Sequence, residues 1–323
     1  MRYVFLLNYF ADKKKALELE CAIREFEAAK GAKVEIHRTE YPGHAGELAA
    51  ASAAKYQSDA IIFACGGDGT VHEVANALAF GQTPMSVLPM GTGNDFARSI
   101  LPETYYRHPS KIIAAIENFE LCHLDLIRVD CYDDDSVFLP EASRYSVNIT
   151  SFGLDTMVNA CAKEMIRKTN RNGFIRKNAY TLAILKCFIK GWRFNMNYSL
   201  ELQHGKEKAE GKIQYCLACI CNGQYYGGGF RPSPASKPDD GIIEVCIVED
   251  LPRRQAIPLV NRYKKGQHFG HPKVMYYPVT SGIFSSADRG SRIHGNYDGE
   301  DFYAHQVRFE VIPGALPFAF FSI

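Results

Sequence analysis

The 323-residue sequence carries almost no net charge, with 37 Lys and Arg against 36 Asp and Glu. The charge of the whole molecule therefore favours neither a nucleic-acid partner nor a membrane. No apolar run approaches the length that spans a bilayer. The apolar N-terminal run 3–7 lacks a cleavage site of small residues, so it is not a signal peptide. We expect a cytoplasmic protein whose ten cysteines are reduced.

What is present is organised around a strand that ends in a glycine turn. Residues 60–65 form an apolar run typical of a buried strand, and Gly66, Gly67 and Gly69 follow around Asp68. Thr70 and Glu73 fit a capping box, which predicts that a helix begins at Thr70. Glycines and a helix N-terminus together bind phosphate. The carboxylate of Asp68 would repel phosphate unless a cation intervened, which favours Mg²⁺, although an ordinary tight turn is the alternative.

A second glycine turn follows on the next predicted strand. Residues 85–89 form the strand, Gly91 to Gly93 form the turn, and Asn94 or Asp95 caps the next helix. Two such turns on successive parallel strands lie side by side at the carboxyl edge of the sheet, where these sheets bind ligands.

The alternation of strands and helices continues to about residue 121, which predicts a doubly wound parallel sheet. After residue 121 the pattern changes to β-like runs separated by polar turns. This change predicts an antiparallel β domain, interrupted by a helical insertion over about 155–190.

The helical insertion is basic. Between residues 161 and 193 there are nine Lys or Arg and a single acid, Glu164, interleaved with large apolar residues. A second acid-free basic stretch covers 253–273. Such segments bind an anionic membrane surface. A solvated helix face and RNA binding are the alternatives.

Two late turns are rich in acid. Residues 294–300 place Asp298 and Glu300 around a glycine, and residues 237–242 place Asp239 and Asp240 before Gly241. The first turn is a candidate for a general base, and the second for a hard-cation site. Solvated turns are the alternative for both.

Taken together, these motifs resemble the catalytic domain of diacylglycerol kinases and related lipid kinases, including sphingosine and ceramide kinases. The resemblance covers nearly the whole chain. It rests on the two glycine turns and on further blocks in the family's order, which are 122–126, 151–155, 222–230, 237–241 and 298–300.

The resemblance implies an α/β plus all-β fold. An N-terminal doubly wound parallel sheet, Rossmann-like and similar to phosphofructokinase and NAD kinase, is followed by an antiparallel β-sandwich with a helical insertion. The implied boundaries are 1–122 for the nucleotide-binding domain and 123–303 for the lipid-kinase domain. Residues 304–323 form a β-like tail that can return to the N-terminal domain.

The resemblance also implies roles for individual residues. Glu300 is the expected general base, with Asp298 as the alternative or as the residue that orients it. Asp125 and Arg98 match supporting positions. The expected metal positions are Asp68, Asp95, Asp240, Lys237 and the carbonyl of Ile242. The expected nucleotide contacts are Asn8, Thr39, Gly66, Gly67, Asp68, Gly69, Thr70, Val71, His72, Gly91, Thr92, Gly93 and Asn94.

The first loop departs from the family pattern, because Asn8 is not followed by the usual proline and glycine. The side chains of Lys13 to Lys15 are candidates to replace the missing backbone contacts. Lys237 is also an unusual residue for a metal loop.

These expectations lead to an ATP- and Mg²⁺-dependent lipid kinase that phosphorylates a lipid hydroxyl, with diacylglycerol as the expected acceptor. The alternatives are another lipid alcohol such as a sphingoid base or ceramide, a soluble acceptor, and a non-catalytic nucleotide-binding module. The expected partners are ATP and a lipid substrate at a membrane surface, without nucleic acid, and a homodimer is left open. The expected location is cytoplasmic and peripheral to the membrane.

Overall fold

The computed structural model describes residues 1–323 apart from 169–172, 191, 204–206 and 322–323, and it leaves out the side chains of 173–178, 180, 188 and 190. The basic residues Arg171, Arg176, Lys177 and Lys190 of the insertion thus have side chains outside the described part. The chain divides into two compact units. The first comprises Met1–Leu126, Lys237–Gly241 and Ile312–Ile323, and the second comprises Ile127–Ser236 and Ile242–Val311.

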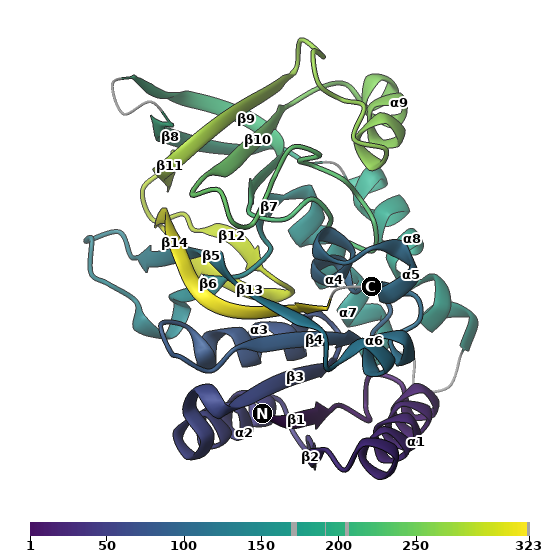
Figure 1. Ribbon diagram of the computed structural model, residues 1–323. Coiled ribbons are helices and arrows are strands. Elements are labelled where there is room, and N and C mark those ends of the chain that lie inside the picture. The colour runs from purple at the N-terminus through teal and green to yellow at the C-terminus, as the bar shows by residue number, and fades with distance from the viewer. Residues whose placement is uncertain (169–172, 191, 204–206, 322–323) are drawn as a thin grey trace. The chain divides into compact units, whose positions relative to one another are not determined.

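The first unit alternates strands and helices (Figure 1). Its elements are β1 (Arg2–Leu7), α1 (Lys13–Lys30), β2 (Lys33–Arg38), α2 (His44–Tyr56), a 3-10 turn (Gln57–Asp59), β3 (Ala60–Gly66), α3 (Asp68–Leu78), β4 (Met85–Pro89), α4 (Asp95–Ile100), α5 (Glu103–Tyr106) and α6 (Ser110–Ala115). The first residues of β5 (Phe119–Tyr132) and the last residues of β14 (Gln306–Phe321) also belong to it.

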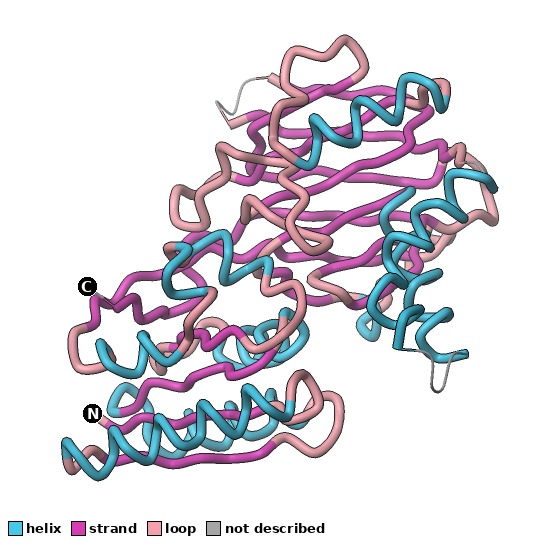
Figure 2. The backbone as a smooth tube through the Cα atoms, turned by 90° about the vertical axis from the view of Figure 1, so that its right-hand side faces the viewer, coloured by secondary structure: helices cyan, strands magenta, loops and turns pink. Residues whose placement is uncertain are grey.

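The strands of the first unit form the predicted parallel sheet. Its order is β2-β1-β3-β4, and Phe318 of β14 pairs in parallel with Met85 beyond β4. Helices lie on both sides of these strands (Figure 2). The central strand β3 is buried along its whole length, as a strand covered on both faces must be. Within this core, Phe5 stacks on Phe63 with ring centroids 4.6 Å apart.

The predicted capping box is wrong. Helix α3 begins at Asp68, two residues before Thr70, and it has no side-chain cap. The carboxylate of Glu73 instead accepts hydrogen bonds from the N–H groups of Gly43 (2.8 Å) and Ala45 (3.1 Å), so it caps the start of α2. A carboxylate at a helix N-terminus is equally stabilising when another helix supplies it.

The second unit is mainly antiparallel. Its elements are the rest of β5, a 3-10 turn (Pro140–Ala142), β6 (Arg144–Ser146), β7 (Ile149–Gly153), α7 (Leu154–Lys168), α8 (Gly173–Lys190), β8 (Phe194–Leu202), β9 (Lys208–Cys221), β10 (Ile243–Glu249), α9 (Arg253–Lys264), β11 (Val274–Ser286), β12 (Ile293–Tyr297), β13 (Glu300–Ala304) and the start of β14.

The strand order in this unit is β13-β12-β7-β9-β10-β11-β14. Because β8 pairs with both β9 and β11, the sheet curls around a large apolar core that contains Phe152, Phe284 and Phe309. Aromatic rings meet edge to face in that core, with Phe152 and Phe284 at 5.3 Å and Phe284 and Phe309 at 5.0 Å. The predicted combination of an α/β part and an all-β part is therefore confirmed.

The predicted helical insertion corresponds to α7 and α8, which follow β7 directly. The acid-free stretch from Arg253 contains a helix that the sequence analysis did not predict, α9, with Pro258 inside it. Within the described part of the chain, no helix is long and apolar enough to cross a membrane. All ten cysteines are free.

Candidate active site

The two glycine turns of the first unit touch one another. The N–H groups of Met90 and Gly91 donate to the carbonyl of Gly66 at 2.8 and 3.3 Å. A Cβ on Gly91 would lie only 2.6 Å from the Cα of Gly67, so no larger residue fits there without a backbone shift. Gly69 has open space around it and Thr92 is exposed, which leaves both turns accessible to a ligand.

Two carboxylates converge on the second turn. A Cβ on Gly93 would lie 3.0 Å from Asp68 Oδ2 and 3.4 Å from Asp95 Oδ2. The other oxygen of Asp68 accepts a hydrogen bond from the N–H of Phe96 at 3.1 Å, which fixes its orientation. Mg²⁺ is typically held by one or two carboxylates, water and substrate phosphates. These two residues therefore fit a magnesium ion bound together with a nucleotide.

The loop after β1 is organised by Asn8. Its Oδ1 accepts from the N–H groups of Phe10 and Ala11, and its Nδ2 donates to Thr70 Oγ1 at 3.0 Å. The side chain therefore ties this loop to the start of α3 without the family's proline and glycine. Thr39 is buried after β2, and its N–H donates to the carbonyl of Leu7 at 3.0 Å.

Two predicted nucleotide contacts lie inside α3. Val71 and His72 are both buried there, and Asn76 Nδ2 donates to the His72 carbonyl at 3.0 Å. Their side chains support the helix behind the turn. Any contact they make with a nucleotide would therefore come from the backbone.

A polar cavity of about 430 Å³ lies beside the second turn. Its lining comprises Pro89, residues 91–94, Lys15, Arg98 and residues 106–109. Lys15 is in the first turn of α1, and Arg98 Nη2 approaches the carbonyl of Gly93 at 3.5 Å. Asn94 adopts a left-handed conformation with φ 53°, and its Nδ2 closes the turn by donating to the Gly91 carbonyl at 2.8 Å.

Asp125 anchors the predicted metal loop. Its carboxylate accepts hydrogen bonds from the N–H groups of Gly241 (2.7 Å) and Gly314 (2.8 Å), and its own N–H donates to Pro238. Burial raises the pKa of Asp125, and the N–H donors lower it in part. The loop therefore belongs to the first unit, whereas the sequence analysis placed it within the second domain.

The other predicted metal residues are less constrained. Lys237 and Asp240 are exposed on the loop, and Ile242 is the first residue of the chain's return to the second unit. Among the described residues, no three His, Cys, Asp or Glu side chains gather as a metal-binding group.

Asp298 in the second unit is held by four donors. Its oxygens accept from Ser146 Oγ at 2.9 Å and from the N–H groups of Val147, Asn148 and Ile149 at 2.7–3.0 Å. The residue is buried and left-handed, with φ 51°. This arrangement fixes the position of the carboxylate and of the segment between β6 and β7.

Glu300 is exposed at the start of β13, and three hydrogen bonds hold the turn before it in place. The N–H of Gly299 donates to Asn296 Oδ1 at 2.9 Å, and Lys163 Nζ of α7 donates to the Gly299 carbonyl at 2.7 Å. Lys163 also pairs with Asp301 at 2.9 Å. Burial raises the pKa of Asp301, but hydrogen bonds from His294, Lys163 and Asn296 outweigh it and leave the pKa at about 2.

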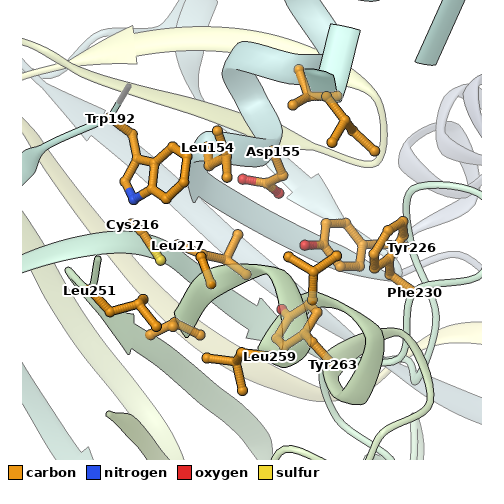
Figure 3. A pocket seen from close by; sticks show the side chains of 15 residues that line it. Leu154, Asp155, Trp192, Cys216, Leu217, Tyr226, Phe230, Leu251, Leu259 and Tyr263 are labelled. Carbon is orange, nitrogen blue, oxygen red and sulfur yellow. The ribbon is translucent and has the colours of Figure 1, made fainter. Parts of the chain in front are cut away.

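An apolar pocket lies between α7, α8, α9 and β9 of the second unit (Figure 3). It is lined by Leu154, Asp155, Val158, Ile184, Trp192, Cys216, Leu217, Tyr226, Phe230, Val248, Leu251, Ala256, Leu259, Val260 and Tyr263. The carboxylate of Asp155 points into this mainly apolar space (Figure 3). Ligand pockets characteristically combine apolar walls with a few polar groups.

Burial raises the pKa of Asp155 to about 7, although the hydroxyl of Ser151 and the N–H of Thr156 lower it in part. Gly153 precedes Asp155 by two residues and has a φ of 96°. A Cβ there would lie 2.6 Å from the Cys216 carbonyl oxygen, so the backbone needs glycine at this point. The pocket was not predicted from the sequence because its lining residues are spread over more than a hundred positions of the chain. The available signal was a carboxylate two residues after Gly153, which ends a buried strand.

Comparison with known proteins identifies the family. The sequence profile of the diacylglycerol kinase catalytic domain matches residues 2–129. That of the YegS C-terminal NAD kinase beta sandwich-like domain matches residues 148–320, more than half of the chain. The chain belongs to the diacylglycerol kinase family. This lipid kinase is therefore a phosphotransferase, and the resemblance seen in its sequence is confirmed.

Individual relatives of the kinase agree with this assignment. A diacylglycerol kinase of Staphylococcus saprophyticus is 25% identical over 276 residues, which are 84% of this chain and 80% of that protein. A diacylglycerol kinase of Staphylococcus haemolyticus is 26% identical over the same length, 84% of this chain and 74% of that protein. A solved diacylglycerol kinase from Bacillus anthracis has the same fold, with a TM-score of 0.66 and 16% identity over 98% of this chain and 96% of that one.

Proposed function

We propose that this lipid kinase uses ATP and Mg²⁺ to phosphorylate the free hydroxyl of diacylglycerol. The observation that carries the proposal is the contact between the two glycine turns, with Asp68 and Asp95 converging on Gly93. Backbone N–H groups and two carboxylates at one point suit a nucleotide with a bound cation.

The nucleotide phosphates would be held by the first unit. Gly66 to Thr70 and Gly91 to Asn94 would supply backbone N–H groups, and Asn8 would keep the first loop against α3. Lys15 and Arg98 line the cavity beside the second turn and would neutralise phosphate charge. Lys15 would thereby compensate for the first loop's missing residues.

Asp68 and Asp95 would hold the magnesium ion. When bound, Mg²⁺ supplies charge neutralisation at the β- and γ-phosphates. Asp240 would contribute from its loop, which Asp125 keeps in place through Gly241. Lys237 and the carbonyl of Ile242 remain candidates for the neighbouring positions of that loop.

Glu300 would act as the general base. It would take the proton of the acceptor hydroxyl while the oxygen forms a bond to the γ-phosphorus and the bond to ADP breaks. The four donors on Asp298 favour a positioning role for that residue, since its oxygens are already engaged.

The acceptor's hydrocarbon would occupy the apolar pocket of the second unit. The side chains of Trp192, Leu217 and Leu259 offer it apolar walls, and Asp155 offers a polar group near its head. An apolar pocket favours a lipid acceptor over a soluble one such as a sugar phosphate.

The test is phosphate transfer from labelled ATP, with Mg²⁺, to mixed micelles carrying diacylglycerol, sphingosine, ceramide or monoacylglycerol in turn. We expect label in diacylglycerol. Asp68→Asn and Glu300→Gln should each lose more than about 100-fold in kcat, while the exposed control Glu207→Gln should keep full activity.

Three other results would each overturn one part of the proposal. Label only in another lipid would overturn the choice of acceptor. No label in any lipid while ATP still binds would overturn the proposed reaction in favour of a soluble acceptor or a non-catalytic module. Full activity of Glu300→Gln would overturn the choice of base.

A further inference from the structure

The outer surfaces of α8 and α9 expose large aliphatic side chains. Leu185 is 60% exposed, Ile189 is 71% exposed and Ile257 is 64% exposed. Leu185 and Ile189 are four residues apart and therefore share one face of α8. Exposed aliphatic residues are ordinary when scattered, but a group of them indicates a contact surface.

One hydrogen bond joins these positions. Arg253 Nη2 of α9 donates to the carbonyl of Ile189 at 3.0 Å, near the end of α8. Ile257 is one helical turn after Arg253, so it lies on the same face of α9 as the side chain that reaches α8. We call Leu185, Ile189 and Ile257 the aliphatic ridge.

The surroundings of the ridge are basic. Lys186, Arg193, Arg253 and Arg254 are all exposed near it. No Asp or Glu occurs between residues 165 and 200 or between residues 251 and 287. Among the described residues, two acids approach this set: Asp250 lies 3.9 Å from Arg193, and Glu164 of α7 interacts electrostatically with Lys186. The surface therefore combines exposed hydrocarbon with positive charge, which matches an anionic bilayer.

The same two helices line the apolar pocket with their inner faces. Ile184 comes from α8, and Ala256, Leu259 and Val260 come from α9. If the acceptor lipid enters this pocket from a bilayer, the helices that line the pocket must contact that bilayer. The aliphatic ridge is on the outer side of this wall.

We propose that the aliphatic ridge and its basic surround dock this kinase on anionic phospholipid bilayers. The proposal rests on the proposed function, since it specifies how the pocket meets its lipid. Ile189 and Ile257 enter the interface, while Lys186 and Arg254 approach the phosphate headgroups. Each cationic side chain near such a surface contributes about a fivefold increase in binding.

The test is co-sedimentation of the full chain with phosphatidylcholine vesicles, with and without 30 mol% phosphatidylglycerol. We expect binding only to the anionic vesicles. Lys186→Gln with Arg254→Gln should weaken it about 25-fold, and Ile189→Asn with Ile257→Asn should weaken it at least tenfold. Lys111→Gln and Leu121→Asn, which change exposed residues of the first unit, should leave binding unchanged.

Phosphorylation of a short-chain, monomeric diacylglycerol separates this proposal from the previous one. Ridge variants should retain that activity and lose activity on vesicles. Vesicle binding without any lipid phosphorylation would refute the proposed function but support docking. Equal binding of wild type and ridge variants would refute docking, as would preferential binding to single-stranded RNA over anionic vesicles.

Discussion

At the scale of single residues, Gly91 is the position where the two turns leave least space. Gly91→Ala would bring a Cβ to 2.6 Å from Gly67 Cα, so the backbone of both turns must move. We expect a loss of about 1–3 kcal/mol in the free energy of unfolding and weaker ATP binding. Gly69→Ala is the matched control, because its Cβ would meet no atom within 4 Å and alanine is the better helix former. Thermal unfolding of both variants checks this, and equal melting temperatures would contradict it.

Asp155 provides a prediction on pH. In the folded protein its carboxyl has a pKa of about 7 and so stays protonated below that pH. An unfolded aspartate ionises at about pH 4. Between these values the folded state binds more protons, so stability falls as pH rises. Asp155→Asn should remove this dependence and increase the free energy of unfolding at pH 8 by up to about 4 kcal/mol. Urea unfolding at pH 5 and pH 8 measures the effect, and an unchanged pH dependence in the variant would contradict it.

At the scale of elements, the turn between β12 and β13 depends on α7. Lys163→Met removes the contacts to the Gly299 carbonyl and to Asp301 that fix the turn carrying Glu300. We expect kcat to fall about 10- to 100-fold, with KM for ATP unchanged. The free energy of unfolding should fall by about 1 kcal/mol or less, because the Lys163 side chain is half exposed to water.

Lys168→Met is the control for that experiment, since Lys168 on the same helix pairs with the exposed Glu164 and not, among the described residues, with the turn that carries Glu300. A raised KM with unchanged kcat in Lys163→Met would argue against the positioning role. So would a loss of activity that Lys163→Arg does not restore.

Helices, strands and turns could be predicted from the sequence where neighbouring residues determine the local structure. The glycine turns, the buried strand β3 and the change from parallel to antiparallel patterning all follow from short-range composition. The role of Glu73 was predicted wrongly. A threonine followed three residues later by a glutamate has the same local sequence whether the glutamate caps its own helix or, as here, a neighbouring one. The apolar pocket and the role of Lys163 could not be predicted, because they depend on residues more than a hundred positions apart.

At the scale of the whole molecule, we propose that ATP binds to the first unit and that the lipid binds to the second. Saturating ATP with Mg²⁺ at 100 times its dissociation constant should stabilise the unit that binds it by about 2.7 kcal/mol. Hydrogen exchange should then slow at residues 66–70 and 91–94, and not at α8 and α9. Micelles of diacylglycerol should give the reverse pattern. Protection of the apolar pocket by ATP alone would contradict this division.

The first unit is built from three separate stretches of chain, the last of which begins at Ile312. During synthesis, its β1 to β4 leave the ribosome long before the strand that pairs with β4. The 197 residues that follow Leu126 take roughly 10–40 s to translate at typical rates. For that interval the β4 edge of the sheet is open, and β4 is buried and apolar in the finished protein. The nascent kinase therefore carries an open apolar strand edge during this interval, and we expect it to be most prone to aggregation then.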